Sequence, residues 1–251
     1  MMDFTVLTLF PELIDAFFEH GMISRGIEKK LITGSSINIR DFSTDRHKTV
    51  DDRPYGGGSG MVMKPEPLQA AVLYAKKKMP ESKVVLMTPQ GTRFSQAKAW
   101  ELSCANEGLI FICGRYEGID ERITSCLVDE EISIGDYVMT GGELASMVII
   151  DSIARLIPGV LGSCESPKSD SFSDDRLEYA QYTRPEEFEG LPVPEVLLSG
   201  NHEKIRQWRK RSSLQRTFLK RPDLFRKNKL NLEEKKILMQ WSQELEVFVK
   251  E

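Results

Sequence analysis

The sequence predicts an α/β protein with a mainly parallel sheet, followed by a small all-helical carboxyl-terminal domain. Strand-like apolar segments alternate with helical segments as far as residue 157, a pattern typical of a parallel sheet covered on both faces. Residues 162–175 are rich in serine and aspartate, and helical apolar spacing resumes beyond Pro185. We therefore expect a first domain at 1–161, a flexible connector at 162–175 and a helical domain at 176–251.

The first elements show this alternation most clearly. Residues 4–9 are β-branched and apolar, which predicts a strand, and Pro11 suits the first turn of a helix that continues to His20. The same reasoning predicts further strands at 36–42, 83–88, 109–113 and 132–134, and further helices at 67–77, 95–104, 119–127 and 142–157.

Composition limits the classes of protein to consider. With 251 residues and 40% hydrophobic content, the chain is long enough to bury a core. It has no run of about 18 apolar residues and no basic segment before its first apolar run, so we expect no membrane span, no secretory signal and a cytoplasmic location. Its four cysteines form no C-x-x-C pair and its three histidines are scattered, which favours buried free thiols over a zinc site or disulfides.

Charge is distributed unevenly along the chain. The formal net charge is −4, yet residues 201–229 carry eleven basic and two acidic side chains, a local balance of +9 that leaves the remainder distinctly acidic. This asymmetry indicates a catalytic body joined to an element that binds a polyanion. An ordinary solvated helical face is the alternative interpretation.

Two glycine-bearing segments, 113–122 and 133–143, are the most distinctive part of the sequence. In each, an apolar strand-like run enters a glycine-containing turn just before a helical segment, so bare backbone can approach a small ligand closely. The chain has no G-x-G-x-x-G after a strand and no G-x-x-x-x-G-K-[ST]. The segments therefore predict a cofactor pocket of a rarer kind, with tight turns that bind nothing as the alternative.

A third segment, residues 45–61, combines charged residues with four glycines. Its composition predicts an exposed loop. Taken alone, a simple connection is favoured over a lid on an active site.

These segments, in this order, resemble the bacterial tRNA (guanine-N(1))-methyltransferases of the TrmD family, members of the SPOUT class of knotted methyltransferases. The resemblance covers nearly the whole chain. The matching motifs lie at residues 9–12, 51–58, 89–91, 113–122, 134–142, 157–160, 170–172, 182–185 and 198–202.

The resemblance implies a first domain whose carboxyl-terminal part threads a loop to form a deep trefoil knot. General rules of topology do not predict a knot, so this expectation comes from the family alone. The knotted loops are expected to hold S-adenosyl-L-methionine in a bent shape, with backbone groups reading the adenine and ribose. The implied cofactor-binding residues are Pro89, Gly114, Tyr116, Glu117, Ile134, Gly135, Asp136, Tyr137, Val138, Met139, Gly141 and Gly142.

The resemblance also implies the chemistry. Guanine nitrogen 1 carries a proton at neutral pH, so methylation needs a base and a cation. Asp170 is the implied general base, and Arg155 is expected to face the charge that develops on oxygen 6 or the carboxylate of the cofactor. The family acts as a homodimer in which the connector of one subunit completes the pocket of the other, and it also uses Mg²⁺, for which Glu117 is a candidate contributor.

The implied substrate is the anticodon stem-loop of tRNA. Its methylated base is guanosine 37, preceded by another guanosine and swung out of its stack. The basic carboxyl-terminal domain would grip the phosphates, which position the RNA but carry no sequence information. The expected tRNA-binding residues are Ser171, Arg184, Asn201, Lys204, Arg206, Arg209, Lys210 and Arg216.

One stretch departs from the family pattern. The family usually has Gly-Leu-Leu-Asp followed by proline before Tyr-Thr-Arg-Pro, whereas residues 175–182 read Asp-Arg-Leu-Glu-Tyr-Ala-Gln-Tyr, with the acid kept as Glu178 and the proline replaced by Ala180. This affects the expected clamp on the target base. Two alternative functions are methylation of a ribose 2′-hydroxyl by the same fold class, and RNA binding without catalysis.

Overall fold

The computed structural model describes residues 1–105, 107–162, 170–227 and 229–250. The chain divides into two compact units, Met1–Cys164 and Glu165–Glu251. Most of the predicted connector, residues 163–169, lies outside the described residues. Within the described ranges, no helix is both long enough and apolar enough to cross a lipid bilayer.

The amino-terminal unit is built on a five-stranded, fully parallel sheet, as predicted. The strand order is β2-β1-β6-β5-β7, so neighbouring strands are joined by crossovers rather than hairpins. The strands are β1 (Met2–Thr8), β2 (Ile32–Asn38), β5 (Lys83–Arg93), β6 (Leu109–Cys113) and β7 (Glu130–Ser133). The trefoil knot implied by the resemblance stays a prediction.

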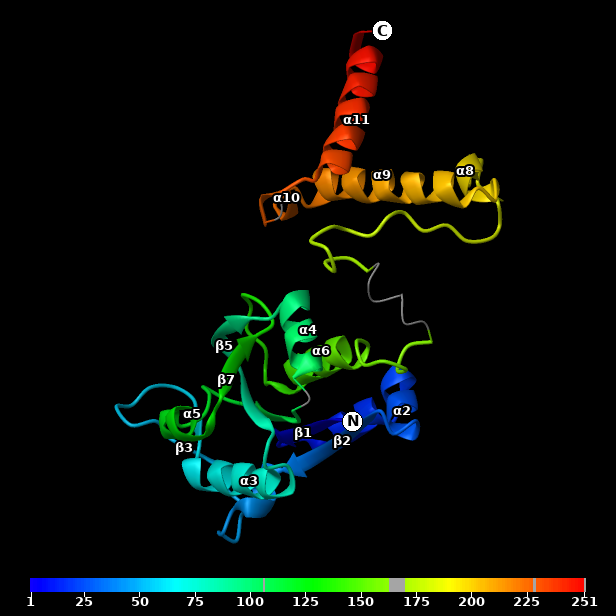
Figure 1. Ribbon diagram of the computed structural model, residues 1–251. Coiled ribbons are helices and arrows are strands. Elements are labelled where there is room, and N and C mark those ends of the chain that lie inside the picture. The colour runs from blue at the N-terminus through cyan, green and yellow to red at the C-terminus, as the bar shows by residue number, and fades with distance from the viewer. Residues whose placement is uncertain (106, 163–169, 228, 251) are drawn as a thin grey trace. The chain divides into compact units, whose positions relative to one another are not determined.

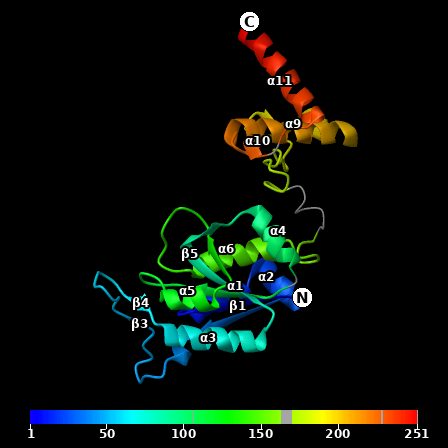
Figure 2. The same ribbon diagram turned by 60° about the vertical axis from the view of Figure 1, so that its left-hand side comes forward.

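Helices cover both faces of this sheet, because alternate residues of each strand point to opposite sides. In β6, Leu109, Phe111 and Cys113 join one buried cluster, whereas Ile110 and Ile112 join the other. The first cluster packs on α1 (Pro11–Phe18), α2 (Gly21–Glu28), α4 (Gln96–Cys104) and α6 (Glu143–Ala154). The second packs on α3 (Pro65–Lys78), α5 (Glu121–Leu127) and the 3₁₀ turn η1 (Ile39–Phe42); Figures 1 and 2 show α3 opposite α4 and α6.

Two strand predictions were wrong in their extent. The strand expected at 36–42 ends at Asn38, because the Asn38 side chain accepts a hydrogen bond from the Arg40 N–H at 3.0 Å and starts the turn η1. The strand expected at 83–88 continues to Arg93, with a shift in its register against β7 between Met87 and Thr92.

The carboxyl-terminal unit is mainly helical but also contains a small antiparallel pair of strands, which the prediction of an all-helical domain did not include. Figures 1 and 2 show α9 and α11 meeting near the end of α9 with α10 beside the junction. The elements are β8 (Glu187–Phe188), β9 (Leu191–Pro192), α8 (Glu195–Leu198), α9 (His202–Lys220), α10 (Leu224–Lys227) and α11 (Leu232–Lys250).

Residues 170–184, which we call the strap, run alongside α9 (Figure 1). Hydroxyl groups of α9 hold the strap by its main chain. The Leu177 N–H donates to Thr217 Oγ1 at 2.9 Å, Ser213 Oγ donates to the Leu177 carbonyl at 2.6 Å, and the Ala180 N–H donates to Ser212 Oγ at 3.0 Å. The strap is therefore part of the carboxyl-terminal fold from its first described residues onward.

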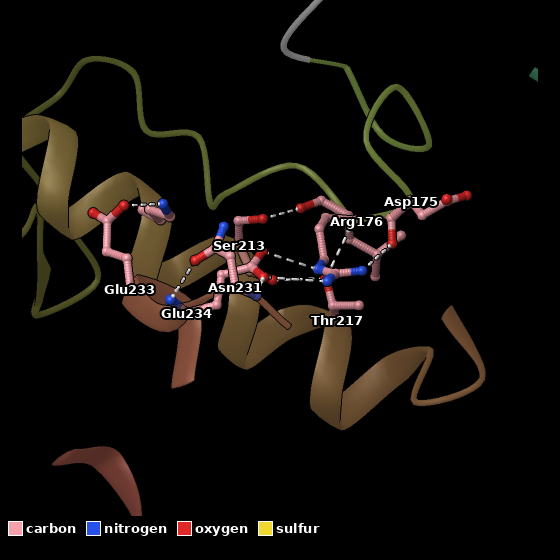
Figure 3. Close-up of polar contacts among 9 residues, drawn as sticks. Asp175, Arg176, Ser213, Thr217, Asn231, Glu233 and Glu234 are labelled. Atoms are coloured by element: carbon pink, nitrogen blue, oxygen red, sulfur yellow. Dashed lines mark hydrogen bonds and ion pairs between the residues drawn. The ribbon is translucent and has the colours of Figure 1, made fainter. Parts of the chain in front are cut away.

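A buried ion pair fixes the same segment against α11 (Figure 3). The Arg176 side chain is 5% exposed, its Nε lies 3.4 Å from Glu234 Oε1, and its guanidinium stacks 4.7 Å from the centre of the Phe225 ring. Glu234 also accepts the Asn231 N–H at 2.9 Å, while its own N–H donates to Asn231 Oδ1, which forms a capping box at the start of α11. Asp175, where the family pattern has glycine, adopts a left-handed φ of 59°.

We predict that Arg176→Leu lowers the free energy of unfolding by roughly 3–5 kcal/mol, because it leaves the Glu234 carboxylate buried without its cation. The matched control is Arg206→Leu, which breaks an exposed pair with Glu203 and should change stability little. Urea denaturation followed by helical circular dichroism measures both. Equal losses in the two variants would contradict the assignment of the buried pair as a stabilising contact.

Candidate functional site

A cavity of about 330 Å³ lies at the carboxyl end of the parallel strands in the amino-terminal unit. Its walls are the end of β5, the loop after β6 and the loop between β7 and α6. In open parallel sheets, ligands bind at the carboxyl ends of the strands, where successive loops diverge. The position of the cavity therefore marks it as the candidate site.

The cavity brings together the predicted cofactor-binding residues, with one exception. Asp136 is exposed and does not line it. The predicted residues that do are Pro89, Gly114, Tyr116, Glu117, Ile134, Gly135, Tyr137, Val138, Met139, Gly141 and Gly142. They come from three segments that are separated in the sequence.

The wall from β5 is shaped by the register shift in that strand. Residues 88–91 lie outside the ladder with β7, which turns Pro89 and Gln90 toward the cavity. Only glycine fits at position 91, since a Cβ there would lie 2.4 Å from the main-chain carbonyl carbon of Glu131. The close approach of these two backbones creates the bulge.

The other two walls are glycine loops that are bonded to each other. The Gly142 N–H donates to the Gly114 carbonyl at 3.1 Å, and Arg115 and Gly141 form an isolated antiparallel bridge. A Cβ on Gly142 would lie 2.8 Å from Cys113 Cα, so a larger residue would push the start of α6 away from β6. These contacts hold the two loops together.

The tip of the long loop at 45–61 is flanked by a short antiparallel pair of strands, β3 (Asp51–Asp52) and β4 (Val62–Met63). The Glu117 N–H donates to the Met61 carbonyl and the Met63 N–H donates to the Gly118 carbonyl, each at 3.0 Å. The residues after the tip of this loop therefore support the Gly114 wall. Most of the tip, residues 53–60, is exposed, as expected from its composition.

A buried ion pair that sequence reasoning missed lies behind the glycine loops. The Glu143 side chain is 1% exposed; it accepts a hydrogen bond from Thr8 Oγ1 at 2.8 Å and lies 2.9 Å from Arg115 Nη2. Arg115 also donates to the Thr140 carbonyl at 3.2 Å and stacks 4.3 Å from the centre of the Phe10 ring. The signal in the sequence was a charged residue directly after a glycine in each motif, Arg115 after Gly114 and Glu143 after Gly142.

Of the three described cysteines, Cys113 is buried as expected, whereas Cys104 and Cys126 are exposed. Burial, together with the Glu143 carboxylate, raises the pKa of the Cys113 thiol far above its usual range. The thiol therefore stays neutral near pH 7 and packs as an apolar side chain in the buried core rather than serving as a nucleophile.

The two predicted catalytic residues do not line the cavity. Arg155 is half-buried and caps the carboxyl end of α6, whereas the cavity lies at the amino end. The helix has twelve residues, so these ends are about 18 Å apart. Asp170 belongs to the carboxyl-terminal unit, in a turn where its carbonyl accepts the Ser173 N–H at 3.2 Å.

The predicted tRNA-binding residues fall into three groups. Ser171 and Asn201 have structural partners, because their side chains accept the Glu178 and Lys204 N–H groups at 3.0 and 3.1 Å. Arg206 and Lys210 form ion pairs with Glu203 and Glu233. Among the described residues, no acidic side chain forms an ion pair with the remaining four, which are Arg184, Lys204, Arg209 and Arg216.

Metal ligands are sparse in the described part of the chain, where no three His, Cys, Asp or Glu side chains gather as a metal site would require. Glu117 lines the cavity and offers one carboxylate. Mg²⁺ is commonly held by one or two carboxylates together with substrate oxygens, so Glu117 fits only a site completed by a ligand.

Comparison with known proteins identifies the family. A family model described as tRNA (Guanine-1)-methyltransferase TrmD matches residues 2–227. The chain belongs to the tRNA (guanine-1)-methyltransferase family.

Its relatives match over nearly their whole length. The protein named tRNA (guanine-N(1)-)-methyltransferase in Geotalea uraniireducens is 56% identical over 223 residues, which are 89% of this chain and 90% of that protein. The protein of the same name in Carboxydothermus hydrogenoformans is 54% identical over 100% of this chain and 98% of its own length. That in Staphylococcus carnosus is also 54% identical, over 95% of this chain and 97% of its own length. Membership of the tRNA (guanine-1)-methyltransferase family confirms the resemblance seen in the sequence, and the family description favours base methylation over the ribose alternative.

We predict that Glu143→Gln lowers the free energy of unfolding by roughly 3 kcal/mol. The reason is that the Arg115 side chain, which is only 20% exposed, loses its one carboxylate partner among the described residues. The glycine loops that the ion pair joins to α6 should then become more mobile, and the affinity for a ligand in the cavity should fall. The control is Glu12→Gln at an exposed position in α1. Unchanged stability and unchanged S-adenosyl-L-methionine affinity, by calorimetry, would show that the charge of Glu143 is dispensable.

Proposed function

We propose that this protein transfers a methyl group from S-adenosyl-L-methionine to nitrogen 1 of guanosine 37 in tRNAs in which another guanosine precedes it. The observation that carries the proposal is the cavity at the end of the parallel sheet, where two glycine loops and the β5 bulge converge. Family membership supports the reaction class. A cytoplasmic location follows from the proposed substrate.

In this proposal the cavity holds the methyl donor. The glycine loops present main-chain groups to the polar edge of the adenine, while Ile134 and Val138 provide apolar contact to its face. Val138 is 88% exposed, so it has a large apolar surface for a ligand to cover. The donor supplies an electrophilic methyl group on a sulfonium centre; the protein residues supply binding and proton transfer.

Asp170 and Arg155 have the two roles that guanine chemistry requires. Asp170 accepts the proton from nitrogen 1, which frees the lone pair that attacks the methyl group. Arg155 faces the negative charge that spreads to oxygen 6 as the proton leaves. No step passes through Mg²⁺; Glu117 is the residue we expect to contribute if a metal joins the bound ligands.

The proposal requires a homodimer, because Arg155 lies at the end of α6 far from the cavity of its own chain. The outer face of α6 supports this requirement: Leu144 is 56% exposed and Val148 is 47% exposed, and with Asp151 and Arg155 they follow one stripe at helical spacing. Two such helices packed antiparallel about a two-fold axis would cover these apolar side chains. Each Arg155 would then lie toward the start of the partner's α6, where the partner's cavity opens.

The basic face of the carboxyl-terminal unit is proposed to bind the anticodon stem-loop. Four of the predicted tRNA-binding cations have no ion-pair partner among the described residues: Lys204, Arg209 and Arg216 on α9, and Arg184 on the strap. Such cations are free to replace the counterions of phosphates, so affinity should fall as salt rises. Arg206 and Lys210 would first have to leave Glu203 and Glu233.

Methyl transfer from labelled S-adenosyl-L-methionine to tRNA transcripts tests the reaction. A transcript with guanosine at positions 36 and 37 should yield 1-methylguanosine on nucleoside analysis. Transcripts that lack either guanosine should be poor substrates. Label recovered as a 2′-O-methylated nucleoside would support the ribose alternative, and tight binding of tRNA without any label would support RNA binding without catalysis.

Complementation tests whether the site is shared between two chains. Asp170→Asn should lower the rate by at least about 100-fold. Gly114→Leu should block the cavity without disturbing the fold, since a Cβ there has its nearest neighbour, Ile119 Cγ2, at 3.6 Å. A mixed dimer of the two variants keeps one intact cavity opposite one intact Asp170, so activity should return on co-expression. If activity stays absent, each site is built from a single chain.

A further inference from the structure

The carboxyl-terminal unit contains a second cavity, of about 480 Å³, that the proposed methyl transfer does not use. One wall is the strap at residues 179–184, and the opposite wall comes from α8 and the first half of α9. Binding sites for small molecules usually measure roughly 300–1,000 Å³, so the cavity has room for one nucleotide.

Aromatic rings line this cavity without covering one another. The centres of the Tyr182 and Trp208 rings are 6.1 Å apart and the ring planes are tilted by 59°, so neither ring stacks flat on the other. Tyr182 is 49% exposed. By contrast, the Tyr179 ring is already covered by the Arg209 guanidinium, 4.8 Å from its centre. Open aromatic faces of this kind are stacking platforms for unpaired bases, because every base has a π face.

The rim of the cavity is cationic. Arg184 and Arg209 both line it, and neither has an ion-pair partner within the part of the chain that the structure describes. A guanidinium in this state can form paired hydrogen bonds with a phosphate. Glu186 is the one carboxylate in the lining; it can accept a hydrogen bond from an exocyclic amino group, which adenine, cytosine and guanine carry and uracil lacks.

The walls are held in place by main-chain hydrogen bonds. The Ala180 N–H donates to Ser212 Oγ at 3.0 Å, and the Val193 N–H donates to the Glu186 carbonyl at 2.8 Å. Ile205 and Leu197 also line the cavity. A site that is already ordered loses little conformational entropy when a ligand enters.

We infer that this cavity binds one unstacked nucleotide of the tRNA other than the methylated guanosine. Its base lies against Tyr182 and Trp208, and its phosphate contacts Arg184 or Arg209. The inference rests on the proposed function, since it takes tRNA as the substrate. The carboxyl-terminal unit would then contact a base as well as phosphates. Because base contacts can distinguish one nucleotide from another, this contact would help to set which part of the RNA is bound.

Variants of Tyr182 test the stacking contact. Tyr182→Leu should weaken binding of an unmodified tRNA transcript about 10- to 100-fold, whereas Tyr182→Phe, which keeps the ring, should stay within about twofold of the wild type. Phe188→Ala is the control, because Phe188 is an aromatic residue of the same unit that is 63% exposed and does not line the cavity. Circular dichroism checks that each variant is folded.

Abasic nucleotides placed one at a time in the anticodon stem-loop identify the occupant. At one position other than 37, removing the base should weaken binding to the wild type by as much as Tyr182→Leu weakens binding of normal RNA. When that abasic RNA is combined with Tyr182→Leu, the affinity should fall no further than with either change alone. Methyl transfer by Tyr182→Leu at saturating tRNA should keep its kcat and show a raised KM. These readouts separate a base-binding site from a general defect of folding.

Normal RNA affinity in Tyr182→Leu would overturn the inference, as would an effect that adds to every abasic substitution. An altered oligomeric state in sedimentation, with unchanged RNA affinity, would also overturn it and would assign the cavity to a contact between protein chains. A wild-type protein that shows the abasic effect but methylates no tRNA would instead contradict the proposed function and leave the cavity assignment standing.

Discussion

The buried carboxylate of Glu143 is the charge on which the cavity of the amino-terminal unit depends. Removing a carboxylate from water costs several kcal/mol, and only close partners offset that cost. Here the partners are Arg115, Thr8 and the amino end of α6, whose dipole favours a negative group. They come from the loop after β6, the end of β1 and the helix that follows β7. The glycine loops cannot move apart without leaving this charge unpaired, so the pair keeps the cavity in one shape.

The carboxyl-terminal unit uses the same device at another helix. Glu234 lies in the first turn of α11, as Glu143 lies in the first turn of α6, and each carboxylate is paired with an arginine from an irregular segment. In both cases the arginine also stacks on a phenylalanine, Phe10 or Phe225. A helix start with a buried acid is thus, in each unit, the point at which an irregular segment is attached.

Much of the fold could be predicted from the sequence, because alternation of apolar segments reports directly which faces are buried. The predictions failed where one side chain decides the outcome: Asn38 ends β2 by capping a turn, and Gly91 lets two backbones meet, so a stretch that looks like a turn continues a strand. Most of the residues that line the cavity could be named from glycine turns and family motifs. Glu143 and Arg176 could not, because charged residues are usually solvated, and only tertiary packing buries these two. The distance between Arg155 and the cavity likewise exists only in three dimensions.

The attachment of the strap to α9 has a consequence for how this protein varies. Ser212, Ser213 and Thr217 bond to peptide groups, which every amino acid except proline offers in full. Leu177 and Ala180 are therefore held by their peptide groups, whereas Arg176 is held by its side chain, in the pair with Glu234. At position 180 the family pattern has proline, which has no N–H to donate; the alanine found here therefore adds a bond from the strap to Ser212 that a proline would forbid.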